Sequence, residues 1–183
     1  WHVVFVDVDS SFVKARTREN EVANVTPYEN IGYAKLDGGQ NPKKPYLFIA
    51  GFGKKAFHDL PLKLVSGRLP QNGREILVPS HVASNGGVTM TVGETLSLTV
   101  GKRIDGKKSL GQHDSYSKKR EESLMSGEEK TYTVVGICER PAFEERSAPG
   151  YTLITMETGM KTGSFNAFVA LNNPRQVHSY AED

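Results

Sequence analysis

Short apolar runs recur along the whole 183-residue chain, and most of them have the composition of β-strands. The first run, His2 to Asp7, is β-branched and aromatic and predicts a buried strand. Asp9 or Ser10 follows as the N-cap of a helix. At the other end, residues 165–171 predict a strand, and Asn173-Pro174 predicts the start of a closing helix. Each end of the chain is therefore expected to form a β-α unit.

Between these ends the pattern indicates mainly β-structure. Pro61 limits a helix from Ala56 to Leu60 to little more than one turn. The segment 101–130 combines glycines with many charges and predicts a long exposed hairpin or flexible loop, with a helical turn at Lys118 to Leu124. The other predicted strands are 22–25, 31–36, 45–50, 75–79, 94–100, 132–137 and 151–156.

These elements predict an α+β fold. The two ends of the chain, residues 1–60 and 165–183, are expected to form a split β-α layer. Residues 61–164 are expected to form a β-rich subdomain inserted into that layer. In each terminal unit the strand runs out and the helix returns, so we expect the two ends of the layer to lie on one side of the domain.

Composition narrows the classes of function. The 23 basic and 21 acidic residues give a net charge of +2, without the concentrated basic excess of a nucleic-acid-binding protein, so no nucleic-acid partner is expected. Cys138 is the only cysteine and lies in an apolar run, which predicts a small buried side chain. No stretch reaches the roughly 20 apolar residues of a membrane-spanning helix.

One motif suggests catalysis. Asp7 and Asp9 follow an apolar run as Asp-x-Asp, similar to the first motif of haloacid-dehalogenase-type phosphatases, where two carboxylates act around magnesium. The further acidic pair that such a site needs after a buried strand is missing from the pattern. The alternative interpretation is an outward-facing Asp7 and a helix-capping Asp9. The five histidines lack metal-ligand spacing, and we expect neither cofactor nor metal.

A second series of residues has an architectural character. Gly67-Arg68-x-Pro70 predicts a tight corner, and Arg68 can bond backbone carbonyls or the carboxylate of Glu75. Gly93 is expected in the turn before the strand 94–100. Gly136 lies within the Val-Val-Gly-Ile run of another strand. We interpret these residues as structural, without a catalytic role.

In order, Gly-Arg-x-Pro, Glu-Ile-Leu-Val, Val-Gly-Glu-x-Leu-x-Leu and Val-Val-Gly-Ile resemble the periplasmic core domain of MacB-like and FtsX-like ABC transporter permeases. The resemblance covers about residues 62–156. It implies a non-catalytic extracytoplasmic domain at the cell membrane, facing the extracellular or periplasmic side. Such a domain would couple membrane-helix movement to the handling of a substrate or partner.

The resemblance also implies partners. A cytosolic ATPase subunit or domain would act through membrane helices outside this sequence, and a peptide, lipid or protein would be met outside the cytoplasm. Two alternatives stay open at this point: the magnesium phosphatase that would use Asp7 and Asp9, and a secreted β-rich binding or adhesion module.

Overall fold

The computed structural model describes residues 1–159 and 162–182, and it has the α+β character expected from the sequence. The strands are β1 (Val3–Val8), β2 (Val22–Lys35), β3 (Tyr46–Phe52), β4 (Leu64–Gly67), β5 (Glu75–Pro79), β6 (Thr95–Asp105), β7 (Lys108–Leu110), β8 (Glu122–Cys138), β9 (Gly150–Met156) and β10 (Phe165–Leu171). The helices are α1 (Ser10–Arg16), α2 (Lys54–Asp59), α3 (His81–Ser84), the 3-10 helix η1 (Pro174–Gln176) and α4 (Val177–Glu182).

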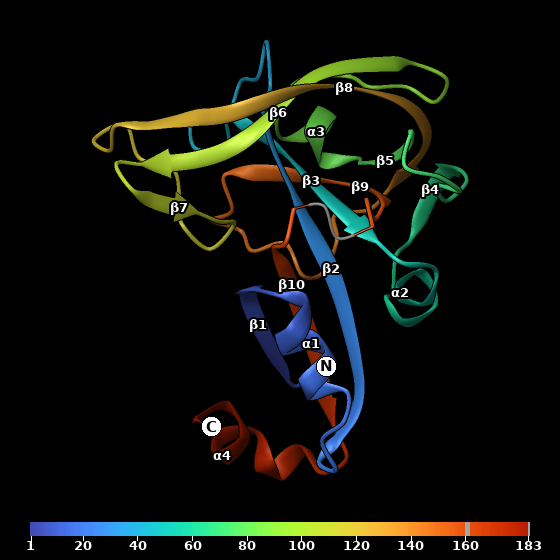
Figure 1. The fold of residues 1–183 in the computed structure, drawn as a ribbon. Helices are drawn as coiled ribbons and strands as arrows, with labels where there is room; N and C mark the ends of the chain where they lie inside the picture. The colour runs from blue at the N-terminus through green and yellow to red at the C-terminus, as the bar shows by residue number, and fades with distance from the viewer. Residues whose placement is uncertain (160–161, 183) are drawn as a thin grey trace.

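The described strands form one mixed sheet in the order β1-β10-β2-β3-β9-β5-β8-β6-β7, with β4 beside β8. The β3–β9 and β5–β8 pairs are parallel. Figure 1 shows β2 as a long strand that starts among β1, β10, α1 and α4 and continues into the β-rich part of the molecule. Strand β2 therefore joins the terminal β-α units to the centre of the sheet.

Strand β2 is continuous, whereas the sequence predicted two short strands separated by Thr26 to Asn30. Pro27 lies opposite Ala167 of β10, and the pairing of β2 with β3 begins only at Tyr28. Among the described residues, no strand pairs with the second edge of β2 at Pro27, so no backbone N–H is needed there. A proline that would interrupt a central strand is tolerated at this edge position.

The sheet closes on itself at one point, because Tyr33 of β2 also pairs with Gly101 of β6. This pairing links β2, β3, β9, β5, β8 and β6 into a ring. Gly32 is required at the closure: a Cβ there would lie 2.8 Å from the Gly101 carbonyl oxygen and 2.8 Å from a Val100 methyl. Its φ of 149° also disfavours other residues.

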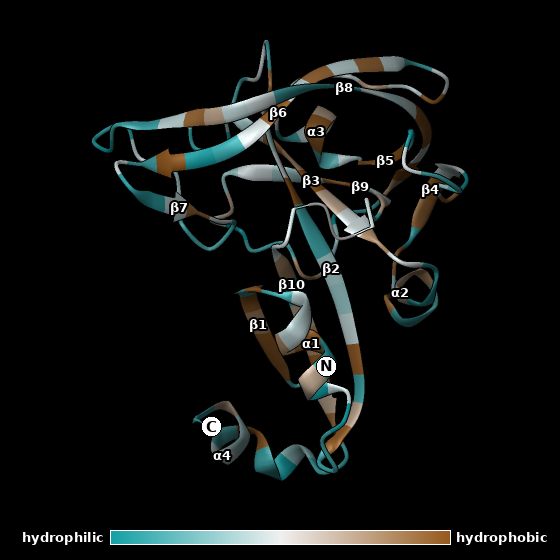
Figure 2. Cartoon of the chain, viewed as in Figure 1, coloured by the Kyte–Doolittle hydropathy of each residue, from teal (hydrophilic) through white to brown (hydrophobic). Residues whose placement is uncertain are grey.

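Strand β3 is the centre of the core, and all seven of its residues are buried. Leu47 and Ile49 pack with Tyr151 and Leu153 in one cluster. Tyr46, Phe48, Ala50 and Phe52 belong to a second, aromatic-rich cluster on its other side. Figure 2 shows hydrophobic colour continuing along β1 and β3, whereas β6 and β8 alternate between hydrophobic and hydrophilic segments.

The terminal β-α units have a small core of their own, in which Val25, Val169, Leu171 and Tyr180 are buried together. Strand β1 is less buried than predicted, because it is the end strand of the sheet. Its inward residues join the small core, but Val4 and Val6 are 42% and 43% exposed on the other face.

The segment 101–130, expected as a long loop or hairpin, consists largely of strand. It contains the end of β6, all of β7 and the start of β8, and residues 102–105 pair with residues 122–125. Tyr46 also reaches this hairpin, since its hydroxyl donates to Glu122. The helical turn predicted at Lys118 to Leu124 is wrong: the chain makes a short turn there and enters β8 at Glu122.

Candidate functional site

The predicted corner at Gly67 is held by an ion pair. Arg68 donates from Nη1 to Glu75 Oε1 at 2.9 Å, and its Nη2 contacts the other carboxylate oxygen. The same Nη1 reaches the Leu69 carbonyl at 3.2 Å, and the Gln71 backbone N–H donates to Glu75. These bonds, led by that of Arg68, lower the pKa of Glu75 to about 2. Pro70 is buried beside them.

The glycines of the motif permit a close approach of two backbones. Gly67 ends β4 with a φ of 72° and lies opposite Gly136 of β8. Gly93 has a φ of 95° in the turn before β6, and its N–H donates to the Val134 carbonyl. The fold thus brings together most residues of the predicted corner: Gly67, Arg68, Pro70, Glu75 and Gly136. Gly93 contacts β8 two residues before Gly136. The hydrogen bonds described for these residues are all made to other groups of the protein.

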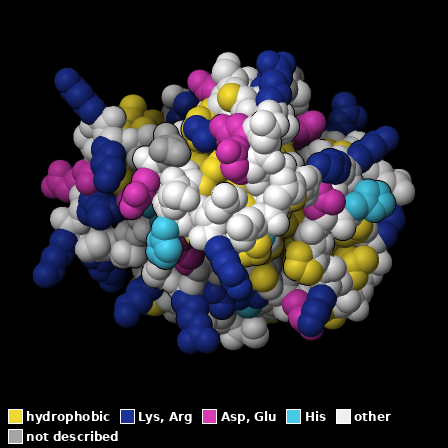
Figure 3. Space-filling model, turned by 90° about the horizontal axis from the view of Figure 1, so that it is seen from below, with side chains coloured by type: hydrophobic (Ala, Val, Ile, Leu, Met, Phe, Trp, Pro, Cys, Tyr) yellow, Lys and Arg dark blue, Asp and Glu magenta, His cyan; other side chains and the backbone are white. Residues whose placement is uncertain are grey.

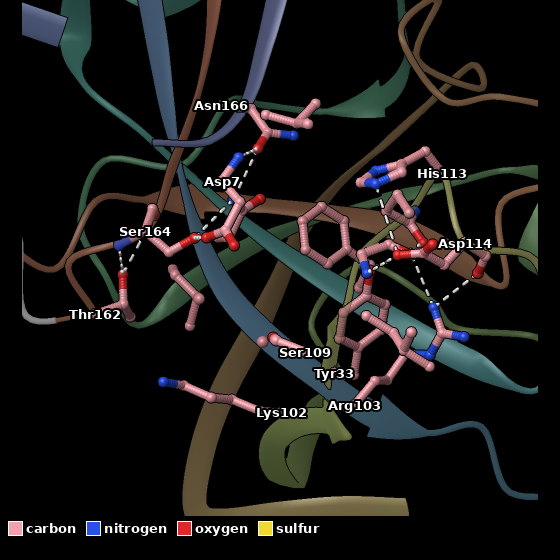
Figure 4. Close-up of a pocket in the computed structure, with 18 of the residues that line it drawn as sticks. Asp7, Tyr33, Lys102, Arg103, Ser109, His113, Asp114, Thr162, Ser164 and Asn166 are labelled. Atoms are coloured by element: carbon pink, nitrogen blue, oxygen red, sulfur yellow. Dashed lines mark hydrogen bonds and ion pairs between the residues drawn. The ribbon is translucent and has the colours of Figure 1, made fainter. Parts of the chain in front are cut away.

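A cavity of about 230 Å³ lies where the β1–β10 end of the sheet meets the β6–β7 hairpin (Figure 4). Its apolar floor includes Ile31, Tyr33 and Phe48. Ser164 lines one side and His113 and Asp114 lie across from it (Figure 4), while Asn166 and the β6–β7 hairpin residues Lys102, Arg103 and Ser109 line the rest. This is the mixed apolar and polar character of a small-ligand site.

Asp7 lies at this cavity on a β-bulge. The register of β1 against β10 shifts between Phe5 and Val8, and Asp7 has a φ of 51°. Its N–H donates to Asn166 Oδ1 at 3.0 Å, and Ser164 Oγ donates to its carboxylate at 2.7 Å. Figure 4 shows these contacts on one side of the cavity. A bulge commonly redirects a side chain in this way.

Asp7 and Asp9 do not form one site. Asp9 is the N-cap of α1 and accepts a hydrogen bond from the Phe12 N–H at 2.8 Å, as the capping interpretation predicted. Asp7 is exposed and bonded to Ser164. Across residues 1–159 and 162–182 no group of three or more His, Cys, Asp or Glu side chains could hold a metal ion. The geometry therefore gives no support to the magnesium phosphatase alternative.

A buried ion pair that sequence analysis missed lies beside the cavity, which one of its two members, Arg103, lines. Arg103 is fully buried and binds Glu122 through Nε at 2.7 Å and Nη2 at 2.9 Å. Its Nη1 donates to the carbonyls of Gly111 and Asp114. Burial alone would lower the pKa of Arg103, but Glu122 raises it above its ordinary value. Arg103 thereby fixes the loop after β7 onto the hairpin.

Cys138 is buried, as predicted. Burial raises the pKa of its thiol to about 12. A thiol of this kind is protonated at neutral pH and is a poor nucleophile.

The surface around the termini carries both signs of charge. Seen from below in Figure 3, Lys and Arg side chains lie around the outline, with Asp and Glu among them and hydrophobic patches between. In the described part of the chain, no helix is both long enough and apolar enough to cross a membrane.

Comparison by sequence finds no relative: neither a family model nor a curated protein matches the chain. Comparison of the fold does find solved structures. The extracellular domain of the noncanonic ABC-type transporter YknZ from Gram-positive bacteria superposes with a TM-score of 0.51 at 11% identity, over 96% of this chain and 86% of that one.

A domain of a permease protein from Porphyromonas gingivalis gives a TM-score of 0.52 at 16% identity, over 92% of this chain and 65% of that one. The periplasmic region of MacB from Actinobacillus actinomycetemcomitans covers 97% of this chain and 72% of its own at 12% identity, with a TM-score of 0.47. The resemblance drawn from the Gly67 to Ile137 motifs is thus confirmed at the level of fold. The chain shares its fold with the extracellular domain of YknZ and with the Porphyromonas gingivalis permease domain.

Proposed function

We propose that this chain is a non-catalytic extracytoplasmic domain of an ABC transporter permease. In this role it couples movement of membrane helices to the handling of a peptide, lipid or protein outside the cytoplasm. The observation that carries the proposal is the likeness to the YknZ extracellular domain, which extends over 96% of this chain. The ATPase partner is a cytosolic subunit or domain that acts through the membrane part.

The position of the chain ends supports this proposal. Figure 1 places the N- and C-termini at the same end of the molecule, beside α1 and α4. A domain that hangs between two membrane helices needs its ends on one side. Strand β2 leads from this end into the ring of β-strands, so a displacement at the termini has a continuous hydrogen-bonded path into the sheet.

We further propose the division into a membrane-proximal layer, residues 1–60 with 165–183, and an inserted β-rich subdomain, residues 61–164. The separate small core around Val169 and Tyr180 supports such a layer for the chain ends, whereas β3 packs in the main core of the ring. Native-state hydrogen exchange tests the division: amides of β1, β10 and α4 should share one opening free energy that differs from that of β5, β6 and β8. A single value throughout would contradict it.

Cysteine labelling in cells tests the location. Cys138 is buried, so Lys118→Cys, in an exposed turn, supplies one reactive thiol. In intact cells that produce the full-length protein, a membrane-impermeant maleimide should label this variant more strongly than the unchanged protein. Labelling only after lysis would contradict an extracytoplasmic location. Co-purification of an ABC ATPase from detergent-solubilised membranes tests the partner.

A further inference from the structure

A second cavity lies away from the termini and apart from the one around Asp7. It has a volume of about 680 Å³ and is bordered by the β2–β3 loop, helix α3 and the segments between β7 and β8 and between β8 and β9. Figure 1 shows α3 at the opposite end of the molecule from α4. The residues that bear on its chemistry are Lys43, Lys44, His81, Arg140, Glu144 and Arg146.

The wall of this cavity is organised by Glu144, whose side chain is fully buried. One carboxylate oxygen accepts the Thr152 N–H at 2.7 Å. The other contacts His81 Nε2 at 2.5 Å, Lys44 Nζ at 3.2 Å and Arg140 Nε at 3.5 Å. The partners of Glu144, led by His81, lower the pKa of its carboxyl despite burial. Glu144 is therefore ionised, and its oxygens are already occupied.

The cationic groups outnumber this carboxylate. Among the described lining residues Glu144 is the only acid, whereas Lys43, Lys44, Arg140 and Arg146 are basic. Four basic side chains facing one carboxylate leave about three positive charges without a counter-charge in the wall. Burial lowers the pKa of Lys44, so a further anion beside it would favour its charged form.

Two of these cations also lack partners. In the described part of the chain, Lys43 and Arg146 form no side-chain hydrogen bond or ion pair, and both are exposed at the mouth of the cavity. The hydroxyls of Tyr116 and Ser147, which line the same cavity, have no hydrogen-bond partner among the described residues either. The cavity thus presents unpaired donors around a fixed, positively charged wall.

From this arrangement we infer that the cavity between α3 and the β8–β9 segment binds an anionic ligand through a phosphate or carboxylate group. Lys43 and Arg146 contact the oxyanion, and Lys44 and Arg140, held by Glu144, supply the positive field behind them. A guanidinium with a free face suits a planar carboxylate or two phosphate oxygens. The inference does not depend on the proposed transport function.

An NMR titration of the ¹⁵N-labelled chain with pyrophosphate tests the site. Shift changes should concentrate at residues 41–44, 81–85, 115–116 and 140–148. The double variant Lys43→Gln/Arg146→Gln should bind at least tenfold more weakly. The matched control Arg18→Gln/Lys107→Gln removes the same charge at exposed positions outside the cavity and should bind as the unchanged chain does.

Equal weakening in the two double variants, shift changes elsewhere, or no saturable binding would overturn the inference. If the Lys43→Gln/Arg146→Gln chain does not fold, each single variant should still weaken binding at least threefold. Vesicles of phosphatidylglycerol, compared with vesicles of phosphatidylcholine, distinguish a lipid headgroup from a soluble anion. Binding to phosphatidylglycerol vesicles that depends on Lys43 and Arg146 identifies a lipid headgroup as the ligand. Binding to pyrophosphate without binding to these vesicles identifies a soluble ligand.

Discussion

Gly67 and Gly136 lie directly opposite each other where β4 pairs with β8, and neither position has room for a side chain. A Cβ on Gly67 would lie 2.2 Å from the Val135 carbonyl oxygen, and one on Gly136 would lie 2.4 Å from the Arg68 carbonyl oxygen. The two glycines let the corner that carries the Arg68–Glu75 pair pack directly on β8.

The close approach at Gly136 predicts a large cost for a single methyl group. Gly136→Ala should lower the free energy of unfolding by about 1–3 kcal/mol, because the new Cβ meets backbone atoms that cannot move aside. Gly73→Ala is the matched control, since nothing lies within 4 Å of a Cβ there. Urea unfolding measures both, and equal stabilities of the two variants would contradict the packing of this corner.

The buried pair of Arg103 and Glu122 predicts an asymmetric response to mutation. Either Arg103→Ala or Glu122→Ala should cost about 3–5 kcal/mol of unfolding free energy, since each leaves an uncompensated charge in the interior. The double variant Arg103→Met/Glu122→Leu should cost less than either single change. Lys63→Ala, in an exposed pair with Glu139 at 4.0 Å, should change stability by less than about 1 kcal/mol.

Thermal unfolding, followed by circular dichroism, checks the expected order of stability among these variants. A double variant that is less stable than both single variants would contradict the prediction, because it would mean that the two side chains stabilise the fold largely independently of each other.

The ion pair at the corner predicts a pH dependence. The pKa of Glu75 in the folded chain is about 2, below the ordinary value of 4.5. The folded state therefore binds this proton more weakly than the unfolded state does, so the stabilisation is present above about pH 4.5 and is lost as pH falls toward 2. A ¹³C NMR titration of the Glu75 carboxyl measures the pKa.

Replacement of the partner tests the cause of this shift. Arg68→Gln should raise the pKa of Glu75 toward 4.5, leaving only the smaller effect of the Gln71 N–H. Arg74→Gln removes the same charge from the neighbouring residue, whose side chain has no ion pair among the described residues, and should leave the titration almost unchanged. Similar shifts in both variants would mean that general charge, not the bidentate contact, sets the pKa.

The β-bulge at Asp7 predicts how substitutions at this position change the free energy of unfolding. Asp7→Asn should change the unfolding free energy by less than about 1 kcal/mol, because Asn also adopts a positive φ. Asp7→Val should cost about 1–2 kcal/mol, because a β-branched residue is strained at a φ of 51°. Phosphate-ester hydrolysis that requires magnesium and disappears in Asp7→Asn would instead support the phosphatase alternative.

Local chemistry made part of this structure predictable. Asp9 and Asn173 cap helices as their positions before helical residues indicated, and the Arg68 side chain reaches Glu75 only seven residues away. Contacts of this kind follow from short-range geometry. Pro27 misled the strand prediction, because whether a proline breaks a strand depends on the neighbouring strands, which the local sequence does not specify.

The buried polar groups could not be predicted, because their partners come from distant parts of the chain. Glu29 is fully buried and accepts hydrogen bonds from Thr158 and Thr162, about 130 residues further on. Glu144 likewise meets Lys44 and His81 only through the pairing of β3 with β9 and the position of α3. No periodic pattern marks such residues, so both cavities emerge only from the fold.

Membership of this domain in a membrane permease is tested most directly by the full-length reading frame that encodes it. We expect an apolar segment of about 20 residues shortly before Trp1 and further such segments after residue 183. A full-length reading frame without an apolar segment before Trp1 would contradict it. A single signal peptide with no membrane span would instead indicate a secreted β-rich binding module.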